Sequence, residues 1–188
     1  YKDYQKAKNA EHILAEQIEK GRSELEYIDS VLDTVSRAES ERELAQIREE
    51  LTEQGYLRKQ KGKQRPQAAL PPLEFTSSDG FKILVGRNNT QNDKLTLKIA
   101  NKNDMWLHTK DIHGSHTVVF AEGREISDTA ILEAAQLAAY YSKARESSQV
   151  PVDYTLVRYV SKPSGARPGM VIYVNNKTVY VTPKANIS

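Results

Sequence analysis

The sequence has 188 residues, with 27 Lys or Arg against 25 Asp or Glu, so its formal net charge is +2. It contains no cysteine, which excludes disulfide frameworks, Cys-ligated zinc, iron–sulfur clusters and thiol nucleophiles. No apolar run approaches the roughly 18 residues of a membrane span, so we expect none. The chain begins with neither Met nor a signal peptide, and we expect it to be part of a longer protein.

The charge is unevenly distributed along the chain. Residues 1–54 carry 8 basic and 14 acidic side chains, residues 55–72 carry 5 basic and no acidic ones, and residues 73–188 carry 14 basic and 11 acidic ones. The net charges are therefore −6, +5 and +3. This pattern predicts an acidic first part (1–54), a basic linker (55–72) and a mildly basic domain (73–188), each with its own partners.

The first part has apolar residues at a seven-residue spacing, which is typical of a coiled-coil helix. The two rows of this heptad pattern are Ala7, Leu14, Gly21, Ile28 and Val35, and Tyr4, Glu11, Ile18, Leu25 and Leu32. At 1.5 Å per residue, about 30 residues give an arm about 45 Å long, which needs a packing partner. The same pattern also fits a coiled coil that acts only as a spacer or that dimerises the protein.

A second helix is predicted shortly after the first. Ser40 and Glu43 form a capping box, Leu44, Ile47 and Leu51 give an apolar stripe, and a glycine at position 55 stops the helix. Residues 1–54 should therefore form an antiparallel helical hairpin with arms of unequal length.

The basic linker contains prolines and shows no periodicity, so we expect an extended chain. Its basic side chains either keep a flexible linker soluble or contact the phosphates of a nucleic acid. They are Arg58, Lys59, Lys61, Lys63 and Arg65.

Residues 73–188 are predicted to form an α+β domain, with one main helix packed on a mostly antiparallel sheet. The helix is expected over 128–145, and residues 92–100 suit a helix better than a strand. A hairpin turn is predicted at Asn175-Asn176. The expected strands are 73–76, 81–85, 105–109, 117–120, 154–160, 170–174 and 178–181.

The stretch 104–116 is the richest in chemistry, since it holds the chain's one Trp and three of its four His. On a strand, Trp106 and His108 share one face. They can be packing residues around a tight turn, or a polar–aromatic surface that stacks on bases and bonds to phosphate or ribose. His108, His113 and His116 could ligate zinc, but their spacing is not that of an established zinc motif.

Two loops present cations and amides suited to RNA contact or to a simple polar turn. The first, 86–92, has Arg87, Asn88 and Asn92, and the second, 162–169, has Lys162 and Arg167. No P-loop, GxGxxG, paired-carboxylate site or HExxH occurs, so we expect neither an enzyme nor a cofactor.

Several motifs together resemble the NFACT family, in particular its NFACT-R domain and the end of its coiled-coil middle region. They are IREELTEQGY (47–56), GRNNTQND (86–93), DMWLH (104–108), GSH (114–116), AAQLAAYYSK (134–143) and VSKPSGARPG (160–169). The resemblance covers nearly the whole chain, in order.

The resemblance implies a cytoplasmic factor of ribosome-associated quality control, which binds an obstructed large ribosomal subunit with peptidyl-tRNA and recruits charged tRNA for alanine tailing. The tRNA-engaging N-terminal part of such proteins would be a partner missing from this chain. The family is also described as cell-surface adhesins for host fibronectin and fibrinogen that lack a secretion signal. A third hypothesis is a purely structural piece that positions the missing part.

The resemblance assigns RNA or partner contacts to residues of the core motif, and we group these with the loop residues named above. They are Arg87, Asn88, Asn92, Asp104, Trp106, His108, Gly114, Ser115, His116, Lys162 and Arg167.

Overall fold

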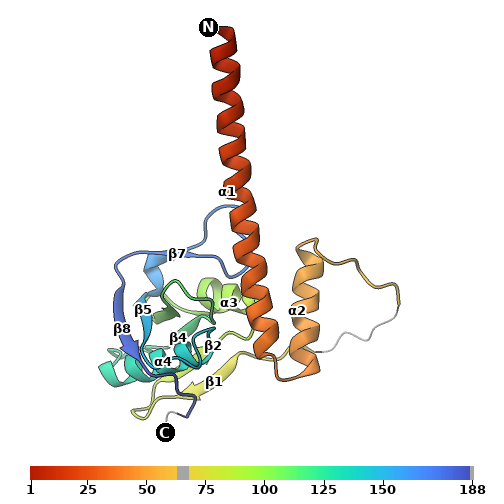
Figure 1. Ribbon diagram of the computed structural model, residues 1–188. Helices are drawn as coiled ribbons and strands as arrows, with labels where there is room; N and C mark the ends of the chain where they lie inside the picture. The colour runs from red at the N-terminus through yellow and green to blue at the C-terminus, as the bar shows by residue number, and fades with distance from the viewer. Residues whose placement is uncertain (63–67, 187–188) are drawn as a thin grey trace.

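The computed structural model describes residues 1–62 and 68–186. A long helix, α1 (Lys2–Arg37), and a shorter one, α2 (Glu41–Glu53), form the predicted hairpin, and an α+β domain packs against its base (Figure 1). None of the helices in the described ranges is both long enough and apolar enough to cross a membrane.

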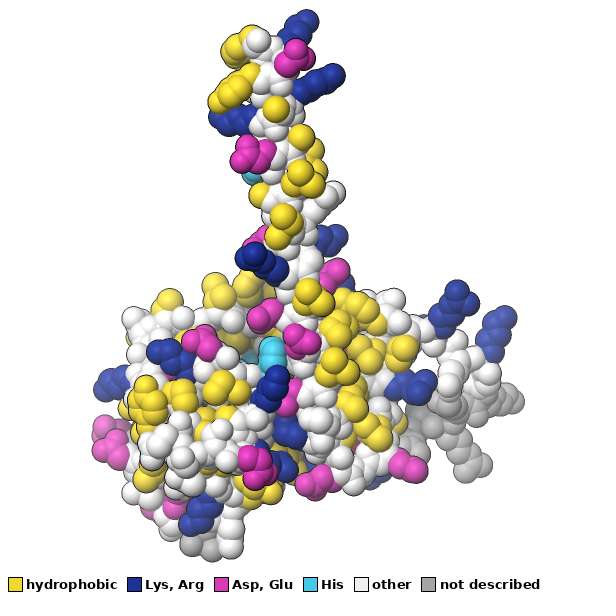
Figure 2. Space-filling view, in the orientation of Figure 1, with side chains coloured by type: hydrophobic (Ala, Val, Ile, Leu, Met, Phe, Trp, Pro, Cys, Tyr) yellow, Lys and Arg dark blue, Asp and Glu magenta, His cyan; other side chains and the backbone are white. Residues whose placement is uncertain are grey.

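The hairpin forms where the sequence predicts it. Ser40 caps α2 by accepting a hydrogen bond from the Glu43 amide, and Gly55 adopts φ +84° just after the helix, a conformation that glycine tolerates. By contrast, residues 1–20, which are Tyr1 and the first part of α1, are all exposed and project from the body, with hydrophobic side chains along their length (Figure 2). The heptad stripe on this projecting part is therefore uncovered.

The domain is built on a six-stranded antiparallel sheet, in the order β1-β2-β4-β3-β5-β8. Its strands are β1 (Leu73–Thr76), β2 (Lys82–Val85), β3 (Met105–Thr109), β4 (Thr117–Val119), β5 (Val150–Leu156) and β8 (Lys177–Val181). A separate pair joins β6 (Val160–Ser161) to β7 (Ile172–Tyr173). The α+β architecture is as predicted.

Each face of the sheet has its own apolar core. On one face lies α4 (Asp128–Tyr140), whose small residues Ala134, Ala135 and Ala138 allow close packing against strands that contribute Leu107. On the other face Trp106 packs with Leu95 and Tyr173. Residues 89–99 are helical, as α3 (Asn89–Lys94) followed by a π-helical turn, η1 (Leu95–Ile99), so the strand alternative for this segment is wrong.

Several sequence-based boundaries are wrong: the strand expected over 170–174 covers only Ile172–Tyr173, and two other elements differ more. The helix expected to run to residue 145 ends at Tyr140, because the following backbone pairs with the 113–115 loop, with a bridge between Gly114 and Ser142. The strand expected at 154 begins at Val150 and includes Pro151. A short 3-10 turn, η2 (Val157–Tyr159), replaces its second half.

The hairpin predicted at Asn175-Asn176 is also wrong. Asn175 does turn the chain, at φ +56°, but the strands on either side of it belong to different sheets. Thr155 donates a side-chain hydrogen bond to the carbonyl of Val174, and this bond holds the chain where it passes from β7 to β8. Local sequence signals a turn here without revealing the pairing of the strands beside it.

The hairpin is fixed to the domain by a buried carboxylate. Glu50 of α2, 3% exposed, accepts hydrogen bonds from the hydroxyl of Tyr27 on α1 at 2.6 Å and from the amide and hydroxyl of Thr90 on α3 at 2.8 and 2.9 Å. Burial and the neighbouring carboxylate raise the pKa of Tyr27 above its ordinary value, so this phenol remains a donor. The three elements therefore meet at one charged group.

This arrangement predicts the effect of Tyr27→Phe. The ring stays, but the buried carboxylate loses a donor, and we expect a loss of about 2 kcal/mol in the free energy of unfolding, measured by urea denaturation. Tyr4→Phe, at an exposed site on the same helix, is the control and should change nothing. Equal stabilities of the two variants would contradict the role given to the Glu50 contact.

Candidate nucleic-acid interface

The Asp-x-Trp-x-His motif begins at the turn before β3, and its first residue is used to build that turn. Asp104, 2% exposed, accepts hydrogen bonds from the backbone amides of Asn101 at 2.7 Å and Ala121 at 2.9 Å. Its backbone carbonyl accepts from the amide of Val157. The carboxylate thus ties three segments together.

The aromatic members of the motif form one packed group beneath α1. Trp106 is 1% exposed and lies parallel to His108, with ring centroids 5.7 Å apart, and edge-on to His116 at 5.3 Å. Tyr173 contacts the indole at 4.7 Å. The sequence correctly places Trp106 and His108 on one face, and the structure adds that this face is largely covered.

His116 is held as a neutral ring. Its Nε2 faces the carbonyl of Gly169 at 3.1 Å and its Nδ1 faces the hydroxyl of Thr96 at 2.8 Å, so Nε2–H donates and Nδ1 accepts. Desolvation, and then the neighbouring His108, lower the pKa of His116 to about 3.

Within the described residues no three His, Cys, Asp or Glu side chains come together to hold a metal ion.

His108 has a different environment. Its Nδ1 lies 2.7 Å from the carbonyl of Thr109 and its Nε2 lies 3.2 Å from the carbonyl of Gly114. Desolvation lowers the pKa of His108 against the raising effect of these two carbonyls. A neutral ring can donate to only one of them, and the shorter contact favours Nδ1–H as the donor.

The polar loop 86–92 is held by contacts inside the molecule. Arg87 pairs with Glu43 of α2, Nη1 to Oε1, at 2.6 Å, and donates from Nε to the Pro71 carbonyl at 2.7 Å. Asn88 caps α3 by accepting from the Gln91 amide. Asn92, 3% exposed, accepts from the backbone amide of His116 at 3.1 Å.

The loop 162–169 is likewise anchored. Lys162 pairs with Asp93 at 2.8 Å and donates to the carbonyl of Arg167 at 2.7 Å. Arg167 in turn donates to the Gln54 side chain at 3.0 Å and lies over the ring of Tyr56 at 5.2 Å. Lys162 therefore holds the loop to α3 within the domain, and Arg167 connects the loop to the hairpin.

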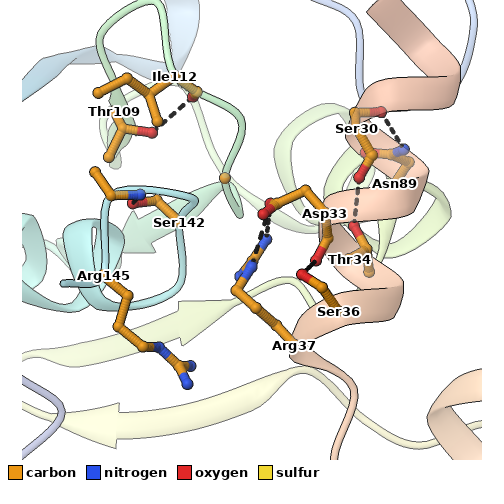
Figure 3. A network of polar contacts seen from close by, with 12 residues as sticks. Ser30, Asp33, Thr34, Ser36, Arg37, Asn89, Thr109, Ile112, Ser142 and Arg145 are labelled. Carbon is orange, nitrogen blue, oxygen red and sulfur yellow. Dashed lines mark hydrogen bonds and ion pairs between the residues drawn. The ribbon is translucent and has the colours of Figure 1, made fainter.

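Further polar contacts near this boundary involve residues that the sequence did not indicate. Ser30 accepts a hydrogen bond from Asn89 at 3.0 Å, across the boundary between α1 and α3 (Figure 3). Nearby on α1, Arg37 pairs with Asp33 at 2.7 Å (Figure 3). A serine on a charged helix carries no local signal of a distant partner, whereas Asp33 and Arg37 are four residues apart and form an ordinary pair within one helix.

The predicted site residues therefore fall into three groups. Most of the core motif is buried, namely Asn88, Asn92, Asp104, Trp106, Ser115 and His116, while His108 and Gly114 are half-buried. Arg87, Lys162 and Arg167 are half-buried and paired. In the linker, Arg58, Lys59 and Lys61 are exposed, and Lys63 and Arg65 lie outside the described residues.

Two family models match consecutive parts of the chain. Residues 1–69 match the model for the NFACT N-terminal and middle domains, and residues 72–187 match that for the NFACT protein RNA binding domain. The chain belongs to the NFACT family. Its NFACT-R domain is the α+β unit described above.

Individual relatives agree with this assignment. The chain is 50% identical to the Rqc2 homolog RqcH of Bacillus subtilis and 45% identical to that of Streptococcus suis, each over 97% of this chain. It spans 32% and 33% of the lengths of those two proteins. The structure of the C-terminal part of the fibronectin/fibrinogen-binding protein from Streptococcus suis matches with a TM-score of 0.92 and 43% identity, covering 97% of this chain and 73% of that one.

The packing of Asn92 predicts that Gly86 cannot be replaced. A Cβ on Gly86 would lie 1.9 Å from Asn92 Oδ1, the atom that accepts from the His116 amide. We expect Gly86→Ala to lower the free energy of unfolding by about 2–3 kcal/mol. Gly21→Ala, where a Cβ meets nothing within 4 Å, should be neutral or stabilise the helix by up to about 1 kcal/mol. Comparable losses for both would contradict this account.

The buried neutral His116 predicts a pH dependence of stability. Because its folded-state pKa of about 3 lies below the unfolded value, unfolding takes up a proton below pH ~6.5, and stability falls as the pH drops from there toward 3. Protonation of His116 in the unfolded chain lowers the free energy of unfolding by about 1 kcal/mol between pH ~6.5 and ~5.5.

Urea denaturation at the two pH values measures this loss in wild type, His116→Gln and the exposed control His12→Gln. His116→Gln should reduce the pH dependence by about 1 kcal/mol, whatever its effect at neutral pH. His12→Gln should retain the wild-type slope, since its side chain is 75% exposed. An unchanged slope in His116→Gln would refute the assignment.

Proposed function

We propose that this chain is a non-catalytic RNA- and ribosome-binding module of a cytoplasmic ribosome-associated quality-control factor. In this role it helps the whole protein to bind obstructed large ribosomal subunits with peptidyl-tRNA and supports alanine tailing. The match of residues 72–187 to an RNA binding domain carries the proposal, and the 50% identity to RqcH supports it. The missing N-terminal part of the protein is its intramolecular partner.

The distribution of available cations supports electrostatic contact outside the packed motif. Arg58, Lys59 and Lys61 of the linker are exposed, as are Lys98 and Lys102 at the end of η1. None of the five forms an ion pair with another described residue. Such side chains can release counterions when they meet phosphates, whereas the paired Arg87 and Lys162 would first have to leave their partners.

In this proposal the buried motif residues act by shaping the domain that presents these cations. Trp106→Ala would empty a core site, at a cost of about 3–5 kcal/mol, so a loss of RNA binding in that variant would not distinguish contact from unfolding. Surface charge variants avoid this ambiguity. They also leave the anchoring contacts of Arg87 and Arg167 intact.

The linker predicts the salt dependence of RNA binding. We expect Arg58→Gln, Lys59→Gln and Lys61→Gln together to weaken binding to a short single-stranded RNA and to reduce the slope of log affinity against log salt by about 2, since each phosphate contact contributes about 0.7. Fluorescence anisotropy across a salt series measures both quantities.

A matched control removes three cations from the projecting part of α1, as Lys2→Gln, Lys6→Gln and Lys8→Gln. Both triple variants change the net charge equally, so a difference between them reports position. Equal effects would contradict a specific role for the linker, and salt-independent binding would contradict the electrostatic mechanism.

A second candidate function is adhesion to host fibronectin or fibrinogen, which the name of the Streptococcus suis neighbour favours. One pull-down at physiological salt separates the two, with obstructed large subunits and immobilised fibronectin offered to the full-length protein. Saturable capture by the subunits alone supports the ribosomal role. Capture by fibronectin alone would replace it with the adhesin role.

A further inference from the structure

The two-stranded ribbon of β6 and β7 has an inner and an outer face. Val160 and Tyr173 form a cross-strand pair on the inner face, where both pack in the core around Trp106. The backbone pairing continues one step further, since the amide of Val174 bonds to the carbonyl of Tyr159. The outer face is uncovered, and its exposed residues are Tyr159, Ser161, Ile172 and Val174.

The chain segments that border this outer face carry only positive charge. Residues 154–188 contain five basic side chains and no acidic one, and residues 94–103 contain three basic and no acidic ones. The two segments meet where Arg158 donates from its backbone to the carbonyl of Lys102 and from its guanidinium to the side chain of Asn103. Lys98, Lys102 and Arg158 are exposed, and none of them forms an ion pair with another described residue.

The carboxylates at the ends of these segments are already occupied. Asp93 pairs with Lys162, and Asp104 accepts from two backbone amides. Asp153 accepts hydrogen bonds from the hydroxyls of Tyr173 and Thr178. The exposed cations beside the ribbon are therefore not neutralised by the acidic residues next to them in the sequence.

The π-helical turn η1 borders the ribbon and adds to the same surface. Leu95 and Ala100, at its two ends, pack in the core that holds Val160, while Leu97 and Ile99 between them are exposed. π-Helical turns are rare and occur frequently at functional sites. The surface thus joins an open aromatic ring, aliphatic side chains and cations.

This combination fits RNA better than it fits a protein partner, because the centres of protein interfaces are depleted in lysine. It also fits a single strand better than a duplex. Unpaired bases stack on aromatic side chains whatever their sequence, whereas the bases of a duplex are already stacked and offer mainly phosphates. In Figure 1 β7 and the basic linker lie on opposite sides of α1, so the ribbon is a contact separate from the linker.

We propose that the outer face of the β6–β7 ribbon binds an unpaired stretch of RNA. One base stacks on Tyr159 beside Val174, and the phosphates that follow it meet Lys102 and Arg158. This inference rests on the proposed RNA-binding function, and it names the surface of the domain and the form of RNA that it selects.

The stacking contact is tested with one RNA strand, offered to the full chain alone and as a duplex with its complement. In fluorescence anisotropy, Tyr159→Ala should weaken binding of the single strand about tenfold and leave binding of the duplex unchanged. Tyr159→Phe keeps the ring and should bind the single strand within about twofold of wild type. Tyr4→Ala, at an exposed tyrosine on α1, is the control and should change neither affinity.

The cations are tested by Lys98→Gln with Lys102→Gln, which do not remove any contact of the core. This pair should lower the slope of log affinity for the single strand against log salt by about 1, since each phosphate contact contributes about 0.7. The control is Lys110→Gln with Lys143→Gln. Both control lysines are exposed and lie beyond the other end of β3, and the charge change is the same.

Two further measurements separate contact from unfolding. Urea denaturation reports whether Tyr159→Ala is folded under the binding conditions. Photo-crosslinking of the wild-type chain to the same strand carrying 4-thiouridine should place crosslinks within 159–174, and crosslinks confined to other segments would overturn the ribbon surface.

The outcomes distinguish this inference from the function on which it rests. If the wild-type chain binds neither form of RNA, the proposed function fails and the ribbon surface fails with it. If RNA binding is the same for single strand and duplex, or is unchanged in Tyr159→Ala, the ribbon surface alone is wrong and the linker remains the contact. Equal losses in Tyr159→Phe and Tyr159→Ala, or equal effects of the two lysine pairs, would also overturn the ribbon surface.

Discussion

The buried carboxylate of Glu50 joins three parts of the chain that are distant in sequence. Donors from α1 and α3 converge on a group of α2, and a buried charge that lost them would be left uncompensated at a cost of several kcal/mol. The hairpin and the domain are therefore held in one relative orientation. The Arg87–Glu43 and Arg167–Gln54 contacts reinforce the same boundary.

Many polar residues of the family motifs are buried or paired within the domain itself. Asn92 positions the backbone of His116, Asp104 holds the turn before β3, and Lys162 secures its own loop through Asp93. Such residues can be essential to binding without touching a ligand, because they fix the surfaces that do. A loss of binding on their substitution therefore needs a parallel measurement of stability.

Local signals in the sequence predicted local structure well. Heptad spacing gave α1, a capping box gave the start of α2, and alternation placed Trp106 and His108 on one face. Two of the errors involve distant partners: α4 ends early because of the 113–115 loop, and the turn at Asn175 separates two sheets. The Glu50 contacts could not be predicted either, since their partners are 23 and 40 residues away in the sequence.

The projecting part of α1 has a mechanical consequence. Its twenty exposed residues extend about 30 Å beyond the body as a continuation of the same helix that is clamped at Tyr27. A change of about 10° in the angle at that clamp would displace the tip by about 7 Å, since Tyr27 lies about 38 Å from the start of the helix. Because Ser30, about one turn beyond Tyr27, is hydrogen-bonded to Asn89, a force applied at the exposed end of α1 is transmitted to α3 of the domain.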